Sequence, residues 1–208
     1  MEPPCRDAPS QAFRALSLAL VAIALAAWAV MAVQKALAPA APPSLAPDVC
    51  VVAPPTPYDP ASGQPLAAPR AVPADVRCPV CGIYPARSPE WAAQVIFSNG
   101  EAQFFDSPLS LFAYLQDVGR YTRGHSAAEI VASYVTDAGS GRWISASSAS
   151  YVHGSSATGP MRAGNLPAFA EADAAQRFAR PRGGLPLHAS DISPDLLQRL
   201  SGGTSHRH

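Results

Sequence analysis

Two cysteines, Cys78 and Cys81, enclose Pro79 and Val80 and are followed by Gly82. Cysteines three positions apart can direct both sulfur atoms to one point, which is a soft metal ion, a disulfide bond or a redox substrate. A bound metal removes the thiol protons, and sulfur ligands select Cu(I) or zinc among the common ions. The spacing alone favours metal binding and leaves a structural disulfide and redox catalysis open.

Neighbouring residues disfavour three familiar kinds of two-cysteine site. A structural zinc site normally has four ligands, often from a second close pair, and the chain has no second pair. Zinc would have to recruit scattered histidines such as His153. Haem attachment requires a histidine directly after Cys81, where Gly82 stands. A thioredoxin-like site lies between a strand and a helix, whereas Pro85 interrupts any helix here.

Met161 is the second candidate for metal chemistry. It is the only methionine beyond the N-terminal third of the chain, and it lies in a loop-like stretch, Gly159-Pro160-Met161-Arg162. A core methionine normally lies within periodic sequence, so this placement predicts a thioether ligand; a gap-filling side chain is the alternative. His153 ends a predicted strand nearby and is an optional imidazole ligand.

Composition argues against nucleic-acid binding and gives no support for an enzyme. The 15 basic and 15 acidic residues cancel, and no basic stripe occurs. No Gly-x-Ser-x-Gly elbow and no glycine-rich phosphate loop is present. We therefore expect a binding protein. The enzymatic alternative is an extracytoplasmic thiol-disulfide oxidoreductase that uses Cys78 and Cys81.

An apolar run from Ala15 to Val33 contains no charged residue. At 1.5 Å per residue, roughly 19 helical residues span about 28 Å, close to the hydrocarbon core of a bilayer. Because Arg6 and Arg14 precede the run, residues 1–14 are expected in the cytoplasm, 15–35 in the membrane and the rest outside. We expect an inner-membrane, single-pass protein with its domain in the periplasm. A cleaved signal peptide is the alternative, and it gives the same compartment.

Residues 36–75 have the composition of a spacer. They hold eleven of the 23 prolines, interspersed with Ala, Ser and Gly, which favours an extended chain without a core. Cys50 lies in this stretch and could be unpaired or form an intermolecular bond. The folded domain is expected over residues 76–200, followed by a disordered tail over 201–208.

The pattern of the domain predicts an α+β fold. Asn99-Gly100 between the apolar runs 91–98 and 101–105 predicts a β-hairpin with a type I′ turn, since both central residues of that turn need positive φ. Ser107-Pro108 then predicts the start of a helix that ends near Gly119.

Further elements follow along the chain. Strands are predicted over 129–137, 142–146, 150–153, 167–170 and 185–188, and helices over 171–179 and 194–200. Pro181 and the following glycines are expected to end the first of these helices. Small antiparallel sheets, each packed with a helix, are the expected architecture. A two-fold ββα-type repeat is one interpretation, because an aromatic residue precedes a helix at Phe105 and again at Phe169.

The combination of motifs resembles the NosL family. The resemblance is carried by Cys78 to Gly82, Phe105-Asp106, 134–137, 143–146, 149–155, Gly159-Pro160-Met161, Ala168-Phe169 and 174–178. It covers roughly residues 76–190, most of the predicted domain.

The resemblance implies a membrane-tethered, extracytoplasmic Cu(I) carrier for nitrous-oxide reductase maturation, working with an ABC-type assembly system. It also implies sulfur ligation of Cu(I) by Cys78, Cys81 and Met161. The chain departs from the family at position 83, where Ile83 replaces the usual methionine. It also carries an apolar helix where many members carry a lipid anchor.

Overall fold

The computed structural model describes residues 53–162 and 165–202. The predicted cytoplasmic tail, the apolar run, Cys50 and residues 203–208 lie outside the described residues. Within the described ranges, no helix is both long enough and apolar enough to cross a membrane.

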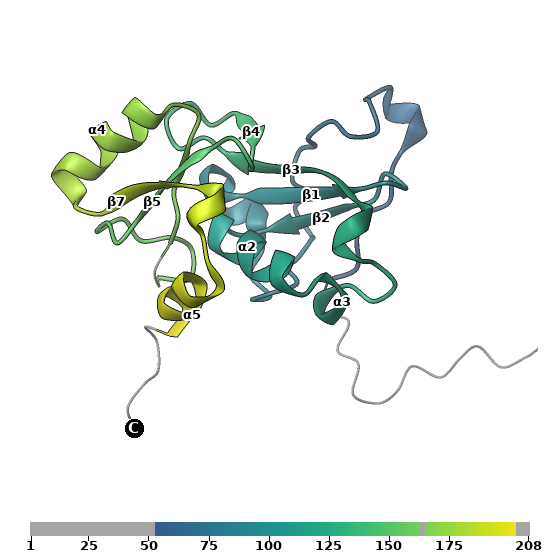
Figure 1. The fold of residues 1–208 in the computed structure, drawn as a ribbon. Coiled ribbons are helices and arrows are strands. Elements are labelled where there is room, and N and C mark those ends of the chain that lie inside the picture. Colours follow the sequence, from purple (N-terminus) through teal and green to yellow (C-terminus); the bar gives the residue numbers. More distant parts are fainter. Residues whose placement is uncertain (1–52, 163–164, 203–208) are drawn as a thin grey trace, which may run out of the picture. The chain divides into compact units, whose positions relative to one another are not determined.

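The first sheet has four antiparallel strands in the order β2-β1-β3-β4 (Figure 1). Its strands are β1 (Ala93–Phe97), β2 (Ala102–Phe105), β3 (Ile130–Thr136) and β4 (Trp143–Ser145). All five residues of β1 are buried, because neighbouring structure covers both faces of this central strand. The four strands predicted for this part of the chain are all present.

The hairpin between β1 and β2 forms as predicted, but the prediction of a type I′ turn is wrong. Gly100 has φ 84°, whereas Asn99 does not have a positive φ. The N–H of Gly100 donates to the carbonyl of Phe97 over 2.8 Å, so Ser98 and Asn99 form the turn and Gly100 follows in the left-handed region. A Cβ at Gly100 would lie 2.8 Å from Cβ of Tyr58, which also favours glycine here.

The first helix, α2 (Pro108–Gln116), starts where the sequence predicts. The hydroxyl of Ser107 accepts from the N–H of Ser110, and Pro108 occupies the first helical position. The helix is shorter than predicted, because Asp117 ends it and caps a separate short helix, α3 (Val118–Tyr121).

The second sheet has three antiparallel strands in the order β6-β5-β7. Its strands are β5 (Ser150–His153), β6 (Ala168–Phe169) and β7 (Leu185–His188), and helices α4 (Ala172–Arg182) and α5 (Pro194–Gly202) complete the fold. Gly183 ends α4 as expected, but Pro181 does not. Pro181 lies inside the last turn, and the helix continues to Arg182. Helix α5 extends to Gly202, two residues into the predicted tail.

The two sheets repeat one topology. In each half, two antiparallel strands precede a helix and a third strand pairs on the other side of the first, giving orders β2-β1-β3 and β6-β5-β7. The pairing of the first two strands agrees as well, since the first residue of each central strand pairs with the last residue of the strand that follows it (Ala93 with Phe105; Ser150 with Phe169). The repeat that the sequence suggested is therefore visible in the topology, and it has the form ββαβ.

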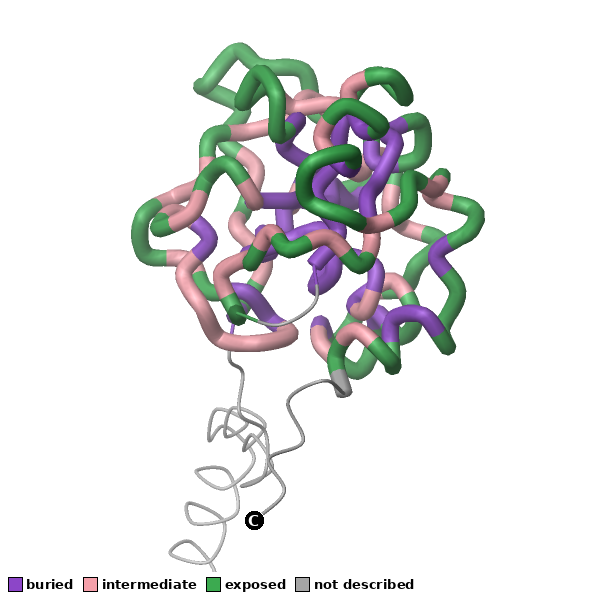
Figure 2. The backbone as a smooth tube through the Cα atoms, turned by 90° about the vertical axis from the view of Figure 1, so that its left-hand side faces the viewer, coloured by how far each residue is buried: buried purple, intermediate pink, exposed green. Residues whose placement is uncertain are grey.

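The main core lies between the first sheet and α2. Alternate β1 residues, Ala93, Val95 and Phe97, pack in it with residues of α2 and α5. A second cluster around Ile96 and Phe104 occupies the opposite face of the same sheet. Figure 2 shows these buried positions gathered at the centre of the fold, with exposed chain around them. Short 3-10 turns connect the elements at Pro60–Ser62, Pro85–Arg87, Pro89–Trp91, Ala127–Glu129 and Ala189–Asp191.

The part of the predicted spacer that the structure describes packs against the folded domain. Residues 53–75, which we call the strap, lie against the first sheet (blue in Figure 1). Thr56 exchanges two backbone hydrogen bonds of 2.8 Å with Ala102 of β2. The side-chain amide of Gln94 pairs with both the N–H and the carbonyl of Arg70, each over 2.9 Å. The folded body therefore includes the strap and starts well before residue 76.

Asp137 joins the two halves. Its carboxylate accepts from the hydroxyl and N–H of Ser140 and from the N–H groups of Gly139 and Ala170, which precedes α4. Its backbone also forms a parallel bridge with Ala168 of β6. Burial raises the pKa of Asp137, but the hydrogen bonds from these partners outweigh burial and hold it below its ordinary value.

We expect Asp137→Asn to lower the free energy of unfolding by about 1–3 kcal/mol, because charge-assisted hydrogen bonds are lost. Because the folded pKa is depressed, this stabilisation is present above the ordinary aspartate pKa of about 4 and is lost as pH falls through the folded value. Urea unfolding between neutral and acidic pH measures both effects. Asp75→Asn, at an exposed position, is the control; equal stability of the two variants would contradict the assignment.

Candidate metal centre

The loop that carries the cysteines is closed by its own backbone. The N–H of Cys78 donates to the carbonyl of Ile83 over 2.8 Å, and the N–H of Gly82 donates to the carbonyl of Cys78 over 2.9 Å. Gly82 has φ 75°, a conformation that a residue with a Cβ adopts at a cost. Glycine at this position therefore permits the tight loop that turns both cysteine side chains to the same side.

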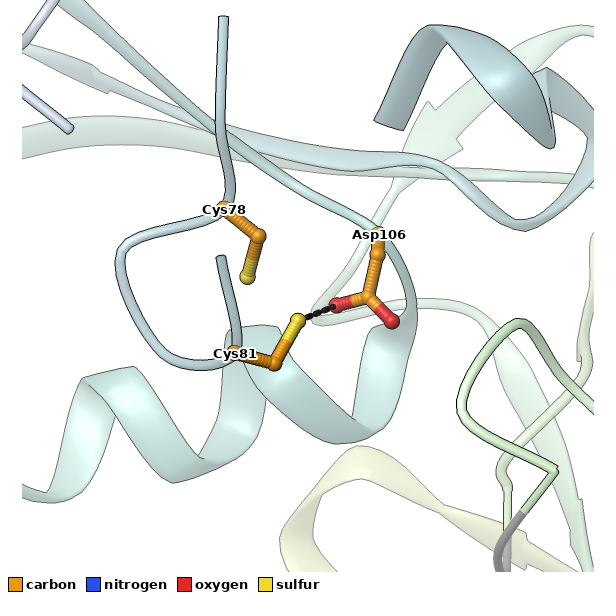
Figure 3. Close-up of side chains that lie close together, drawn as sticks. All are labelled: Cys78, Cys81 and Asp106. Atoms are coloured by element: carbon orange, nitrogen blue, oxygen red, sulfur yellow. Dashed lines mark hydrogen bonds between the residues drawn. The ribbon is translucent and has the colours of Figure 1, made fainter. Parts of the chain in front are cut away.

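Three polar groups converge inside this loop. One ligand atom each from Cys78, Cys81 and Asp106 lies within 4.8 Å of the others. The thiol of Cys81 donates to Oδ1 of Asp106 over 3.1 Å. Figure 3 shows the two sulfur atoms and the carboxyl group directed toward one another. Cys78 and Asp106 are fully buried and Cys81 is partly exposed, so access from solvent is through Cys81.

Asp106 reaches the site because of its place between two elements. It follows the last residue of β2, Phe105, and precedes the N-cap of α2, Ser107. The hairpin returns this junction to the cysteine loop, 25 positions earlier in the sequence. From the sequence, Asp106 was expected only as part of a family motif and not as a site residue. A carboxylate between a buried strand and a helix cap was the available signal.

The electrostatics of the three groups are coupled. The hydrogen bond with Cys78, then burial, then the negative charges of Cys78 and Asp106 raise the pKa of Cys81 well above its ordinary value. Burial and the negative charge of Asp106 also raise the pKa of Cys78, but the contact with the Cys81 thiol and the N–H donors of Asp106 and Cys81 outweigh them and lower that pKa. The pair therefore releases one proton far more readily than two.

One atom of the site lacks a partner. Oδ2 of Asp106 is buried and makes no hydrogen bond within the described structure. An unpaired buried carboxylate oxygen is costly, and a cation between the two sulfurs and this carboxyl group would remove that cost. The donor set of two thiols and one carboxyl group fits a metal ion, and its sulfur content favours a soft or borderline one.

Cys78 and Cys81 are not bonded to each other in this structure, which gives no support to the structural disulfide considered from the sequence. A redox role is also poorly matched by this geometry. The attacking thiol of an exchange reaction must be accessible and ionised, whereas the accessible thiol, Cys81, is the one whose pKa is raised.

Of the two other predicted ligands, His153 is not among the His, Cys, Asp and Glu side chains that converge here in the described residues. Met161 lies in the loop between β5 and β6 with 44% of its surface exposed. His153 is the last residue of β5 and is partly buried. Their role as ligands stays a prediction. Ile83, which replaces the family's methionine, contributes its carbonyl to the loop closure, a role open to any residue type.

We expect Asp106→Asn to leave the stability of the metal-free protein unchanged or to raise it by about 1 kcal/mol, since a poorly satisfied buried carboxyl group is removed. Urea unfolding under reducing conditions measures this change. Asp137→Asn is the matched comparison, because the carboxylate of Asp137 is fully hydrogen-bonded and its loss should destabilise. A large destabilisation by Asp106→Asn would show that the carboxyl group is structural.

This chain is similar to known proteins in sequence and in fold. The NosL family model matches residues 69–197. A search of curated proteins finds no match. The crystal structure of the copper chaperone NosL from Shewanella denitrificans is similar, with 22% identity, a TM-score of 0.53 and coverage of 63% of this chain and 99% of that chain. The solution structure of apo-NosL from Achromobacter cycloclastes has 28% identity, a TM-score of 0.38 and coverage of 50% and 87%. The NosL family model matches more than half of this chain, and the chain therefore belongs to the NosL family.

Proposed function

We propose that this protein is a copper chaperone that binds Cu(I) through Cys78 and Cys81 and passes it to a copper enzyme. The observation that carries the proposal is the convergence of two free thiols and the carboxyl group of Asp106 inside 4.8 Å. Family membership supports it, since the similar protein from Shewanella denitrificans is described as a copper chaperone.

The chemistry of the donors favours Cu(I). Thiolates are soft ligands, and a low coordination number suits Cu(I) better than a divalent ion. Partial exposure of Cys81 leaves a side of the site from which an acceptor's ligand could attack. Transfer then proceeds by ligand exchange, in which each new bond to the ion forms as an old one breaks.

Met161 is proposed as a further sulfur ligand, and His153 as an optional imidazole ligand. The exposed position of Met161 suits a ligand that leaves early during transfer, because thioether is a weaker donor than thiolate. Asp106 has a different role in this proposal. In the metal-free protein its carboxyl group accepts from the Cys81 thiol and orients that sulfur, whereas hard oxygen is a poor direct ligand for Cu(I).

Anaerobic titration with Cu(I) against a competing chelator tests the site. We expect Cys78→Ser/Cys81→Ser to weaken binding by more than about 100-fold, and Met161→Leu by about 10–100-fold. Cys50→Ser, outside the loop, is the control and should bind like the wild type. Equal affinity of the wild type and the double-serine variant would overturn the proposal. Tighter binding of Zn²⁺ than of Cu(I) would assign the site to a different ion.

The compartment and acceptor are proposed from the N-terminal sequence and from the family resemblance. The segment over residues 15–35, which contains the apolar run from Ala15 to Val33, anchors the protein in the inner membrane with its domain in the periplasm. Nitrous-oxide reductase, with its ABC-type assembly system, is the proposed acceptor.

A strain that lacks this chain should make nitrous-oxide reductase with less copper, and the full chain should restore it. Metal analysis of the purified enzyme measures the copper content. Complementation with Cys78→Ser/Cys81→Ser is the matched control and should fail. Full copper content in the deletion strain would exclude this acceptor.

A further inference from the structure

Three side chains form a cationic stack at the ends of the cysteine loop. The guanidinium carbon of Arg77, directly before Cys78, lies 4.3 Å from the ring centre of Tyr84. That of Arg87 lies 4.8 Å from the same ring. Contacts at these distances are favourable cation–π interactions, so they restrict two long side chains that would otherwise be mobile. We call Arg77, Tyr84 and Arg87 the cationic rim.

The charges of the rim are not neutralised. Both arginines are exposed, and the ion pairs in the described part of the chain involve His125 and not these residues. The carboxylates nearest in sequence, Asp75 and Glu90, are exposed and form no ion pair with them. Neither arginine contributes to the pKa shifts of the two thiols, which come from the cysteines themselves, Asp106 and burial. The two positive charges therefore remain available to a molecule outside the fold.

The rim is held next to the accessible thiol. Nη1 of Arg77 donates to the carbonyl of Gly82, the residue after Cys81, over 3.2 Å. A protein that docks on Cys81 covers far more surface than one side chain, typically about 800 Å² per partner. Such a partner must therefore also meet the rim.

We propose that the cationic rim docks and steers the protein that takes the metal from Cys81, and that this acceptor presents carboxylates around its own ligands. This inference rests on the proposed function. The formal net charge of the chain is zero, so attraction of an anionic partner has to come from a local patch. Electrostatic complementarity of this kind acts mainly on the rate and specificity of association.

The reactivity of the metal-free thiols tests the charge of the rim. In a Cys5→Ser/Cys50→Ser background, the dianion dithiobis(nitrobenzoate) and the uncharged dithiodipyridine probe the same site. We expect Arg77→Glu/Arg87→Glu to slow the anionic reagent about 3–10-fold at low ionic strength and to leave the neutral reagent unchanged. The difference should shrink as salt is added. Arg77→Lys/Arg87→Lys should keep the wild-type rate with the anion.

Arg123→Glu/Arg180→Glu is the control, because it changes net charge equally at two other exposed positions. It should leave both rates unchanged. Equal slowing of both reagents by the rim variant would assign the arginines a structural role and overturn the proposal, as would an unchanged rate with the anion.

Transfer of bound Cu(I) gives the second readout. The rim variant should release Cu(I) more slowly to anionic bathocuproine disulfonate, but not to neutral neocuproine, with its Cu(I) affinity unchanged. If the wild type binds no Cu(I), the proposed function fails, while the thiol assay still decides the charge of the rim. Equal transfer rates of variant and wild type to the anionic chelator would overturn the steering role.

Discussion

The candidate site depends on the hydrogen bond from the N–H of Cys78 to the carbonyl of Ile83. Together with the bond from Gly82 to Cys78, it converts a stretch between two proline-containing segments into a closed loop. Without this closure, the two cysteines would lie on an extended chain and their side chains would separate. With it, one thiol is buried, the other is partly exposed, and both face the end of β2.

Comparison of the two halves of the repeat shows which residues form the fold and which form the candidate metal site. Both halves have the same ββαβ topology, yet one half alone has a cluster of metal-ligating groups in the described chain. The position equivalent to Asp106 is Ala170, and the N-cap equivalent to Ser107 is Glu171. The residues before β5 are alanines and serines rather than cysteines. The fold therefore provides a place for a site, and a few substitutions decide whether one exists.

Local patterns in the sequence predicted the elements well. The turn residues Asn99-Gly100 and the cap Ser107-Pro108 act on their immediate neighbours, so the hairpin and α2 could be predicted. Proline content was a poor guide to the strap, because it reports the backbone preference of a segment and not the surface on which the segment lies. The pairing of Gln94 with Arg70 could not be expected from either residue alone.

Only part of the candidate site could be predicted, because local patterns report neighbouring residues and not contacts between distant segments. The spacing of Cys78 and Cys81 is local information, and it identified the two thiols. The contact with Asp106 depends on the complete path through β1 and β2, and no local pattern reports it. The anchor, Met161 and His153 remain predictions, since family resemblance rather than packing supports them.

The strap has a further consequence for the outer edge of the first sheet. β2 is an edge strand, and its backbone groups could pair with a strand of another molecule. Thr56 occupies that edge by exchanging two hydrogen bonds with Ala102. A shortened chain that starts at residue 69, where the family match begins, would leave this edge open to self-association. The proline-rich entry to the domain thus covers part of a strand edge that would otherwise be unpaired.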